Sequence, residues 1–541
     1  MILTYLNKEW PNRVNIVNFI RGVEPRLDID LLETLREELA LVRKHGLPAT
    51  WLIQYDALID DNFVALLKQE TDEKQEIGAW FEVVQPLVEK AGLVWRGRYA
   101  WDWHAHVGFS IGYTPEERER LADVFMEEFR AKFGRYPKSV GSWFIDAHLL
   151  GYLADRYAIV ASCNCKDQWG TDGYTLWGGY YNQAYYPSRL NGFMPAQTAA
   201  NQIPVPVFRM LGSDPIYQYD AADHGHGQTV VTLEPVYTGN EGGGGLPSWV
   251  RWFFDVSFRP AQLSFGYAQI GQENSFGWER IGAGLTDQID LLAQKREEGE
   301  LVVETLAASG EWFKSRYPLT PASAICALED WKNEGRQSVW YYNRNYRVNL
   351  FREKEHFRIR DIHLFDETYE ERYLRDVCAT EDCRYDTLPV MDGARWNDFR
   401  TRTGIEPILF DPSGHARPAP VVSLKVDDTV TGELEVELLL EGGGSIAIRC
   451  AETAITFRSA LDNWGLRMAW GDTAEQPDLQ AAADGIHYRF FGQSYDVRME
   501  GAYSLAYDRK LDSPEAQEND EPANAIAIRP LDRELKWILA R

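Results

Sequence analysis

Short apolar runs alternate with helical segments over the first 315 or so residues, and this alternation most constrains the fold. The clearest example is the run at 14–20, followed by a helix at 31–42 with leucines along one stripe and Gly46 after its end. A strand that is apolar on both faces needs helices on both sides, which is typical of a parallel sheet in an α/β domain. Seven runs have this character, at residues 14–20, 49–54, 76–82, 139–144, 158–162, 230–234 and 263–267. They predict an α/β fold with a (β/α)7 barrel.

Helix signals complete this barrel and set its limits. Thr114, Pro115 and Glu117 form the pattern of an N-cap, a proline in the first turn and a capping-box glutamate, and Gly134 follows the helix. A long helical stretch at about 286–314 closes the region. We therefore expect a barrel domain over residues 1–317.

A long insertion separates the fifth and sixth expected strands, at about 163–229. It is rich in Gly, Tyr, Asn and Trp. Loops of this length are usually functional or disordered, and this one is too aromatic for disorder. We expect it to be ordered and to contribute to a site.

The pattern changes beyond residue 318 to short strands that alternate polar and apolar residues. Such strands are expected at 338–342, 432–438, 445–449, 454–458 and 487–491, with turn signals between them. They predict a β-rich linking domain at 318–415 and a C-terminal antiparallel β domain at 416–541 that resembles a β-sandwich.

Charge and hydropathy exclude several protein classes. The chain has 56 Lys and Arg against 82 Asp and Glu, a net charge of −26, which disfavours nucleic acid as a partner. No run of about 18 apolar residues is present, so no membrane partner is expected. The N-terminus lacks an export signal, which predicts a cytoplasmic protein, although a longer exported precursor stays open. Six cysteines are too few for a disulfide framework, and Cys378 and Cys383 would pair only in an oxidising compartment.

The aromatic content has two interpretations. Trp occurs 19 times, and Phe, Trp and Tyr together make up 13% of the chain. Aromatic side chains dominate burial in large cores, but flat rings also stack on the faces of sugars. Composition alone leaves both interpretations open.

Carboxylates follow several of the expected strands. In strand–helix barrels the working residues project from the carboxyl ends of the strands. Glu82, Asp146, Asp167 and Glu273 stand at such ends. Glycoside hydrolysis needs two carboxyl groups, one to protonate the leaving oxygen and one to attack or to activate water. We therefore predict Asp146 and Glu273 as the catalytic pair, with Asp146 as nucleophile or base and Glu273 as general acid. The alternative is that each caps a helix and that Glu82 only pairs with a cation.

Other polar and aromatic residues are expected to bind substrate beside this pair. His104 and His106, two residues apart, suit a structural role, sugar contact or, less well, a metal. The insertion interleaves rings with Asp, Asn and Gln, a combination that suits a polyhydroxylated ligand. The predicted substrate-binding residues are Glu82, His104, His106, Trp143, Asp167, Trp169, Tyr174 and Trp177.

These motifs resemble the glycoside hydrolase/deacetylase superfamily, whose seven-stranded α/β barrels include polysaccharide deacetylases and glycoside hydrolase families 38 and 57. The resemblance covers about residues 10–315. It rests on the strand order, on Glu76-Ile-Gly78 in the third strand, on the lead from Phe133 to Pro137 and on the closing helix. The block at 139–220 looks like a further branch of the superfamily. The resemblance implies a barrel followed by β domains and an activity on carbohydrates.

The residues that would hold a deacetylase metal are replaced. Where deacetylases have Thr-Phe-Asp-Asp-Gly, this chain has Asn18-Phe-Ile-Arg-Gly22, and the expected histidines fall on Trp80 and Val84. No cofactor is therefore expected, and a divalent metal stays open only if His104 and His106 rebuild a site. Family 57 is similar in placing carboxylates after the fourth and seventh strands. Its order, Glu then Asp, is the reverse of the order here, so the choice of nucleophile stays open.

The predicted function is that of a glycoside hydrolase that cleaves a neutral oligo- or polysaccharide. The alternatives are a non-catalytic carbohydrate-binding protein and a metal-dependent polysaccharide deacetylase. A carbohydrate is the expected partner. The sequence leaves open the sugar, the linkage, the stereochemical outcome and the oligomeric state.

Overall fold

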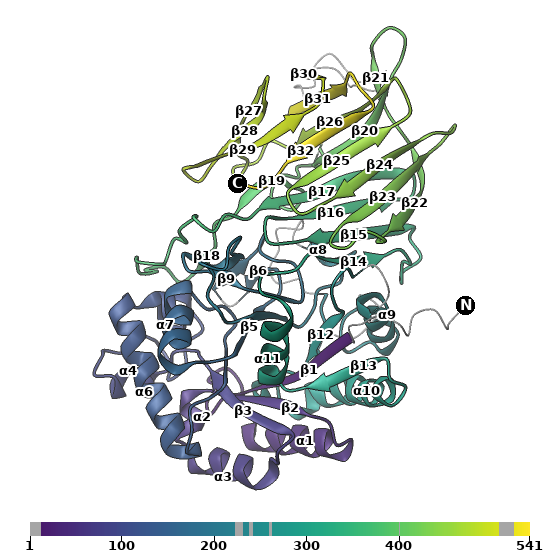
Figure 1. Ribbon diagram of the computed structural model, residues 1–541. Coiled ribbons are helices and arrows are strands. Elements are labelled where there is room, and N and C mark those ends of the chain that lie inside the picture. The colour runs from purple at the N-terminus through teal and green to yellow at the C-terminus, as the bar shows by residue number, and fades with distance from the viewer. Residues whose placement is uncertain are drawn as a thin grey trace.

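An α/β part and a β-rich part are stacked along the molecule in the computed structural model (Figure 1). The structure describes residues 12–171, 173–221, 231–236, 242–258, 262–399, 401–507 and 524–541. In the α/β part, helices surround a curled sheet. The β-rich part follows it in the sequence and is built from antiparallel strands.

The sheet of the α/β part consists mainly of parallel strands. Their order is β12(Tyr267–Ile270), β1(Asn12–Ile20), β2(Ala49–Ile53), β3(Gln75–Trp80), β4(Ser139–Gly141), β5(Ala161–Cys165) and β11(Val207–Met210). A short strand β13(Leu301–Glu304) also pairs with β1, and β8(Ala184–Tyr185) pairs antiparallel with β11. The first three expected strands are therefore confirmed close to their predicted positions.

The curled sheet is not a complete (β/α)7 barrel. Among the described residues no ladder joins β11 to β12, although the rings of Phe208 and Tyr267 lie 5.1 Å apart across the opening. The physical reason is that β8 occupies the edge of β11 that would otherwise pair with β12. The side chain of Gln183, next to β8, spans the gap and donates to the carbonyl of Phe265.

The helices around the sheet begin and end as the capping signals predict. Thr114 and Glu117 form a capping box at the start of α6(Pro115–Phe133), and Gly134 ends the helix with a left-handed φ of 74°. The other long helices are α1(Leu31–Lys44), α3(Asp61–Glu70), α7(Ala147–Tyr157), α9(Pro247–Phe258), α10(Trp278–Glu297) and α11(Leu306–Arg316). No described helix combines the length and hydropathy needed to cross a membrane.

Four predicted elements are corrected by the structure. The fifth and seventh strands begin three and four residues later than expected. The run at 230–234 is not a strand: residue 230 lies outside the described residues, and Thr232 forms an isolated bridge with Ser213. The sixth strand is β11, where Arg209 interrupts the apolar pattern. The long closing helix is two helices, because Gly299 turns the chain and β13 adds to the sheet.

The insertion is ordered and joins the two parts of the molecule. It contains β6(Gln168–Thr171), β7(Tyr174–Leu176), β9(Pro187–Ser188) and β10(Asn191–Pro195). Strand β7 pairs with β18(Cys383–Arg384), which belongs to the β-rich part of the sequence. The thiols of Cys378 and Cys383 are both free.

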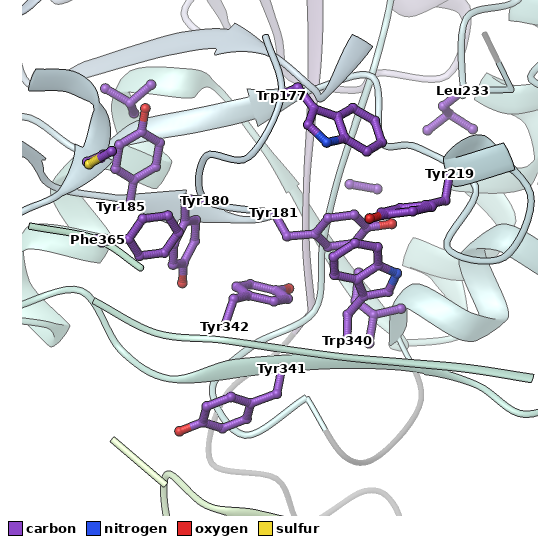
Figure 2. Packing of buried hydrophobic residues seen from close by; sticks show 14 of the residues in the cluster. Trp177, Tyr180, Tyr181, Tyr185, Tyr219, Leu233, Trp340, Tyr341, Tyr342 and Phe365 are labelled. Carbon is purple, nitrogen blue, oxygen red and sulfur yellow. The ribbon is translucent and has the colours of Figure 1, made fainter. Parts of the chain in front are cut away.

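Aromatic side chains of the insertion form a core at this junction (Figure 2). Tyr181 stacks on Trp340 with ring centroids 3.8 Å apart and planes inclined by 7°, and Tyr180 meets Tyr342 edge-on at 5.0 Å. Trp177 lies in the same cluster. Much of the aromatic excess in this segment is therefore core packing.

The β-rich part contains two large antiparallel sheets. The first includes β14(Ser323–Ala327), β15(Arg336–Tyr342), β16(Tyr346–Glu353), β17(His356–Leu364), β20(Gly404–Phe410), β26(Trp464–Trp470), β31(Asn524–Pro530) and β30(Tyr503–Tyr507). The second contains β22(Val421–Asp427), β23(Leu434–Leu440), β24(Ser445–Cys450), β25(Ala454–Ser459), β32(Glu534–Ile538), β29(Gln493–Glu500), β28(Gly485–Phe490) and β27(Asp478–Ala482). Because β20 pairs with β26, the expected parts 318–415 and 416–541 share one sheet.

Candidate active site

Polar side chains gather at the carboxyl edge of the parallel strands. Since parallel strands all end at the same edge, residues that follow different strands meet there. The residues in question are Arg21 after β1, Asp56 after β2, Glu82 after β3, Lys166 after β5, Asp214 after β11 and Glu273 after β12. This edge holds the candidate site.

Arg21 joins the two carboxylates Glu82 and Glu273 at the centre of this edge. Its Nη2 lies 3.0 Å from Oε2 of Glu82 and 2.9 Å from Oε2 of Glu273. All three side chains are at most 5% exposed. The Trp80 Nε1–H also donates to Oε2 of Glu82 over 2.9 Å, and the Trp101 ring covers the guanidinium at 3.8 Å.

The two carboxylates are close enough to act on one bond. Since both Oε2 atoms contact the same nitrogen, they are at most about 6 Å apart, near the separation of about 5–5.5 Å in retaining glycosidases. Glu82 comes from β3 and Glu273 from β12, so strands from opposite sides of β1 and β2 supply the pair.

Arg21 carries a positive charge. Burial lowers its pKa, but the carboxylates of Glu273 and Glu82 raise the pKa by more, so that it lies above its ordinary value. A buried carboxylate pair without a cation would repel strongly, and the guanidinium removes that repulsion. Arg21 therefore positions both carboxylates.

A second ion pair lies beside this cluster. Lys166 Nζ contacts Oε1 of Glu234, and the Gln272 amide donates to Oε2 of Glu234 over 3.4 Å. Gln272 Oε1 in turn accepts from the backbone N–H of Glu273 over 2.9 Å. Sequence reasoning missed Arg21, Lys166 and Gln272 as site residues. Gln272 could have been predicted from its position just before Glu273. The ion pair of Lys166 with Glu234 could not, because no local sequence pattern connects these two residues.

Asp56, in α2(Tyr55–Ile59), adds a third carboxyl group near Arg21 and Glu82. Its Oδ1 accepts from the backbone N–H of Ala57 over 2.7 Å, and its buried Oδ2 has no hydrogen-bond partner among the described residues. Burial raises the pKa of Asp56 to about 6, against the opposing effect of backbone N–H groups and Arg21. The pKa of Asp56 is thus raised toward neutrality by its burial.

Asp56→Asn is expected to change how stability depends on pH. As the pH rises from about 4 to 6, unfolded chains lose this proton while the folded protein keeps it, so the free energy of unfolding of the wild type falls. The loss, about 3 kcal/mol, is complete above about pH 7. Asparagine keeps the acceptor for Ala57 and does not titrate. Urea unfolding at pH 4 and 7.5 measures the effect: between these pH values the free energy of unfolding of the variant should rise by about that amount relative to the wild type. The same pH dependence in both proteins would contradict a raised pKa for Asp56.

Asp146 lies in a separate buried cluster. It is the N-cap of α7, accepting from Leu149 N–H over 2.9 Å, which is the alternative that its sequence context left open. Its carboxylate also contacts Ser110 Oγ and Arg118 Nη1, the latter at 3.1 Å. The nearby Glu371 has its pKa raised to about 8 by burial and by Asp146. These partners are not shared with Glu273, so the structure does not join the predicted pair.

Neighbouring side chains hold His104, whereas the Nδ1 atom of His106 has no hydrogen-bond partner among the described residues. His104 Nδ1 contacts Asp102, and its ring also meets Arg98. The rings of His104 and His106 are 6.3 Å apart, and burial lowers the pKa of His106. Both residues are partly exposed. Their contact with a sugar stays a prediction.

The predicted binding residues of the insertion are mostly covered by protein. Asp167 pairs with Arg209 at 3.0 Å and with Arg347, which ties the insertion to the β-rich part. The rings of Tyr174 and Trp177 are each 2% exposed, so no ring face is available to a sugar. The side chain of Trp169 lies outside the described residues. Trp143, 8% exposed, packs against Phe19 and Trp80 next to Glu82.

A deacetylase-type metal does not fit these residues. The guanidinium of Arg21 stands between Glu82 and Glu273, where it would repel a cation. In the part of the chain that the structure describes, no three His, Cys, Asp or Glu side chains converge as metal ligands. The replacement of metal-binding residues by Ile20, Arg21, Trp80 and Val84 agrees with this geometry. We therefore derive no chemistry through a metal.

Comparison with known proteins identifies the fold. A crystal structure from Parabacteroides distasonis, provisionally described as a glycoside hydrolase/deacetylase, matches with a TM-score of 0.51 and 17% identity, over 70% of this chain and 91% of that one. A Mycobacterium smegmatis structure, provisionally described as a polysaccharide deacetylase, matches with a TM-score of 0.36 and 11% identity, over 57% and 92%. No protein-family model and no curated protein sequence matches the chain. The first likeness confirms the resemblance seen in the sequence at the level of the fold.

Proposed function

We propose that this chain, which has the fold of the glycoside hydrolase/deacetylase superfamily, is a glycoside hydrolase that cleaves a neutral oligo- or polysaccharide. The observation that carries the proposal is the meeting of Glu82 and Glu273 on Arg21 at the carboxyl edge of the strands. Two carboxyl groups at this separation supply the acid and the nucleophile or base that glycoside hydrolysis needs. Glu82 thus takes the role that the sequence predicted for Asp146.

The environment of Glu82 supports a role as nucleophile or base. Glu82 receives Arg21 and the indole N–H of Trp80, and such donors stabilise the ionised form that a nucleophile or base requires. Glu273, the predicted general acid, follows β12 and contacts the same Nη2 atom of Arg21 at 2.9 Å. The short separation favours a retaining reaction, in which Glu82 would form the glycosyl intermediate.

Substrate entry requires one local movement. Arg21 and Glu82 are each 1% exposed, and the ring of Trp101 covers the Arg21 guanidinium. The guanidinium of Arg26 also lies over the Trp101 ring, 4.7 Å from its centroid. A sugar reaches the carboxylates only when the segment that carries Trp101 moves aside. The return of this segment would exclude water from the closed site.

The proposal is tested by incubating the purified chain with a panel of neutral α- and β-linked oligosaccharides and resolving the products chromatographically. We expect shortened oligosaccharides from at least one member of the panel, and none from acidic polymers, because the net charge is −26. Tight binding without product would favour a carbohydrate-binding protein. Release of acetate from acetylated glycans, lost with a chelator, would favour the deacetylase.

A further inference from the structure

We infer that a groove beside the barrel edge, formed by α9 and the loop between β14 and β15, is a second binding site for a neutral glycan chain. The groove has a volume of ≈ 490 Å³, within the range of about 300–1,000 Å³ for ligand pockets. Its lining consists of Ser248, Trp252, Glu329, Asp330, Trp331 and Asn333.

Two tryptophans give the groove the chemistry of a sugar site. The rings of Trp252 and Trp331 are partly exposed, with centroids 6.5 Å apart and planes inclined by 51°. Their apolar faces can stack on pyranose rings, while Ser248 and Asn333 offer hydrogen bonds to the hydroxyl groups at the ring edges. The carboxylates of Glu329 and Asp330 disfavour an anionic polymer, so the ligand is a neutral glycan.

The walls of the groove are held in place before any ligand binds. The indole N–H of Trp252 donates to the carbonyl of Glu329 over 2.8 Å, and that of Trp331 donates to Asp214 Oδ2 over 2.9 Å. Asp330 accepts from the hydroxyl of Tyr217 over 2.7 Å and from the backbone N–H of Glu334 over 2.8 Å. A site built from fixed rings loses little conformational entropy on binding.

Asp214 ties this groove to the edge that carries the candidate active site. It follows β11, and its Oδ2 accepts from both Trp331 and Trp249, the latter over 2.8 Å. One wall of the groove, at Trp331, therefore lies at the same end of the curled sheet as Glu82 and Glu273. The inference rests on the proposed function only for the class of ligand, since glycan binding here needs no catalysis.

The test is binding of neutral hexasaccharides (maltohexaose, cellohexaose, xylohexaose and mannohexaose) to the full chain, measured by isothermal titration. For the hexasaccharide that binds, Trp252→Ala is expected to weaken affinity roughly tenfold or more, because a ring face is lost, and Trp252→Phe should retain most of it. Phe399→Ala, which removes an aromatic ring that is 90% exposed elsewhere, is the matched control and should bind as the wild type does.

The outcomes separate this inference from the proposed hydrolysis. Equal affinity of Trp252→Ala and the wild type, or no binding of any hexasaccharide, would overturn the groove site. Hydrolysis of a short aryl glycoside should be unchanged in Trp252→Ala. A chain that binds through Trp252 but never yields product would overturn the proposed hydrolysis and leave the groove standing.

Discussion

Glu273→Gln is expected to lower the rate of glycan hydrolysis by roughly a thousandfold or more while the protein stays folded. Glutamine keeps the size of the side chain but cannot donate a proton to the leaving oxygen, and general acid catalysis contributes about 10²- to 10⁴-fold. The measurement is kcat on the oligosaccharide that the wild type cleaves, with circular dichroism to check the fold. The kcat on a substrate whose leaving group needs no proton should fall far less in this variant.

Two further variants identify the partner of Glu273. Glu82→Gln should also lose at least two orders of magnitude in kcat, and here the loss should persist with an activated leaving group, because the nucleophile itself is missing. Asp146→Asn keeps a cap for α7 and lies outside the Arg21 cluster, so a folded variant should retain activity. The assignment fails if Glu273→Gln works at the wild-type rate, or if Asp146→Asn is folded and inactive while Glu82→Gln is active.

Arg21→Met is expected to destabilise the protein by about 3–5 kcal/mol at pH 8. Removing one partner of a buried ion pair leaves uncompensated charge, and here two carboxylates would face each other without their cation. Carboxylates that repel each other take up protons more readily in acid, so the loss should be smaller at pH 4 than at pH 8. Urea unfolding of the variant and the wild type at both pH values measures the difference.

Arg118→Met is the matched control for this prediction. Arg118 is also fully buried and pairs with a carboxylate, Asp146, but in the separate cluster. Arg118→Met should lower the free energy of unfolding by a comparable amount. An Arg21→Met variant that unfolds within 1 kcal/mol of the wild type at pH 8 would mean that the guanidinium does not hold the two carboxylates.

Much of the α/β part could be predicted from local patterns. The strands β1, β2 and β3 are continuous apolar runs, and the capping box at Thr114 marks the start of α6 unambiguously. Strand β11 escaped prediction because Arg209 interrupts its apolar pattern, and the arginine is tolerated there only because Asp167 pairs with it. The opening between β11 and β12 follows from the pairing of β8, which is a contact between segments that no local signal reports.

The candidate site was predicted in part. Glu82 and Glu273 were expected at strand ends, and they lie there. Asp146 has the same kind of position, but an aspartate after a strand is equally suited to cap the next helix, and the packing of Arg118 and Ser110 around it could not be inferred from its neighbours in the sequence. The rings of Tyr174 and Trp177 were expected at a sugar site, yet both are buried. Tyr174 packs against Phe109 and Phe144, and Trp177 donates to Asp392 of the β-rich part.

The sequence by itself determined the alternation of strands and helices, the acidic charge and the placing of carboxylates after strands, because hydropathy, capping and charge are properties of neighbouring residues. Only the tertiary structure decided which carboxylates share Arg21, which aromatic rings are core and which line a groove. Those outcomes depend on contacts between segments hundreds of residues apart, such as Arg21 with Glu273 and Trp331 with Asp214. Strand order and packing bring such segments together, and no pattern within either segment encodes the contact between them.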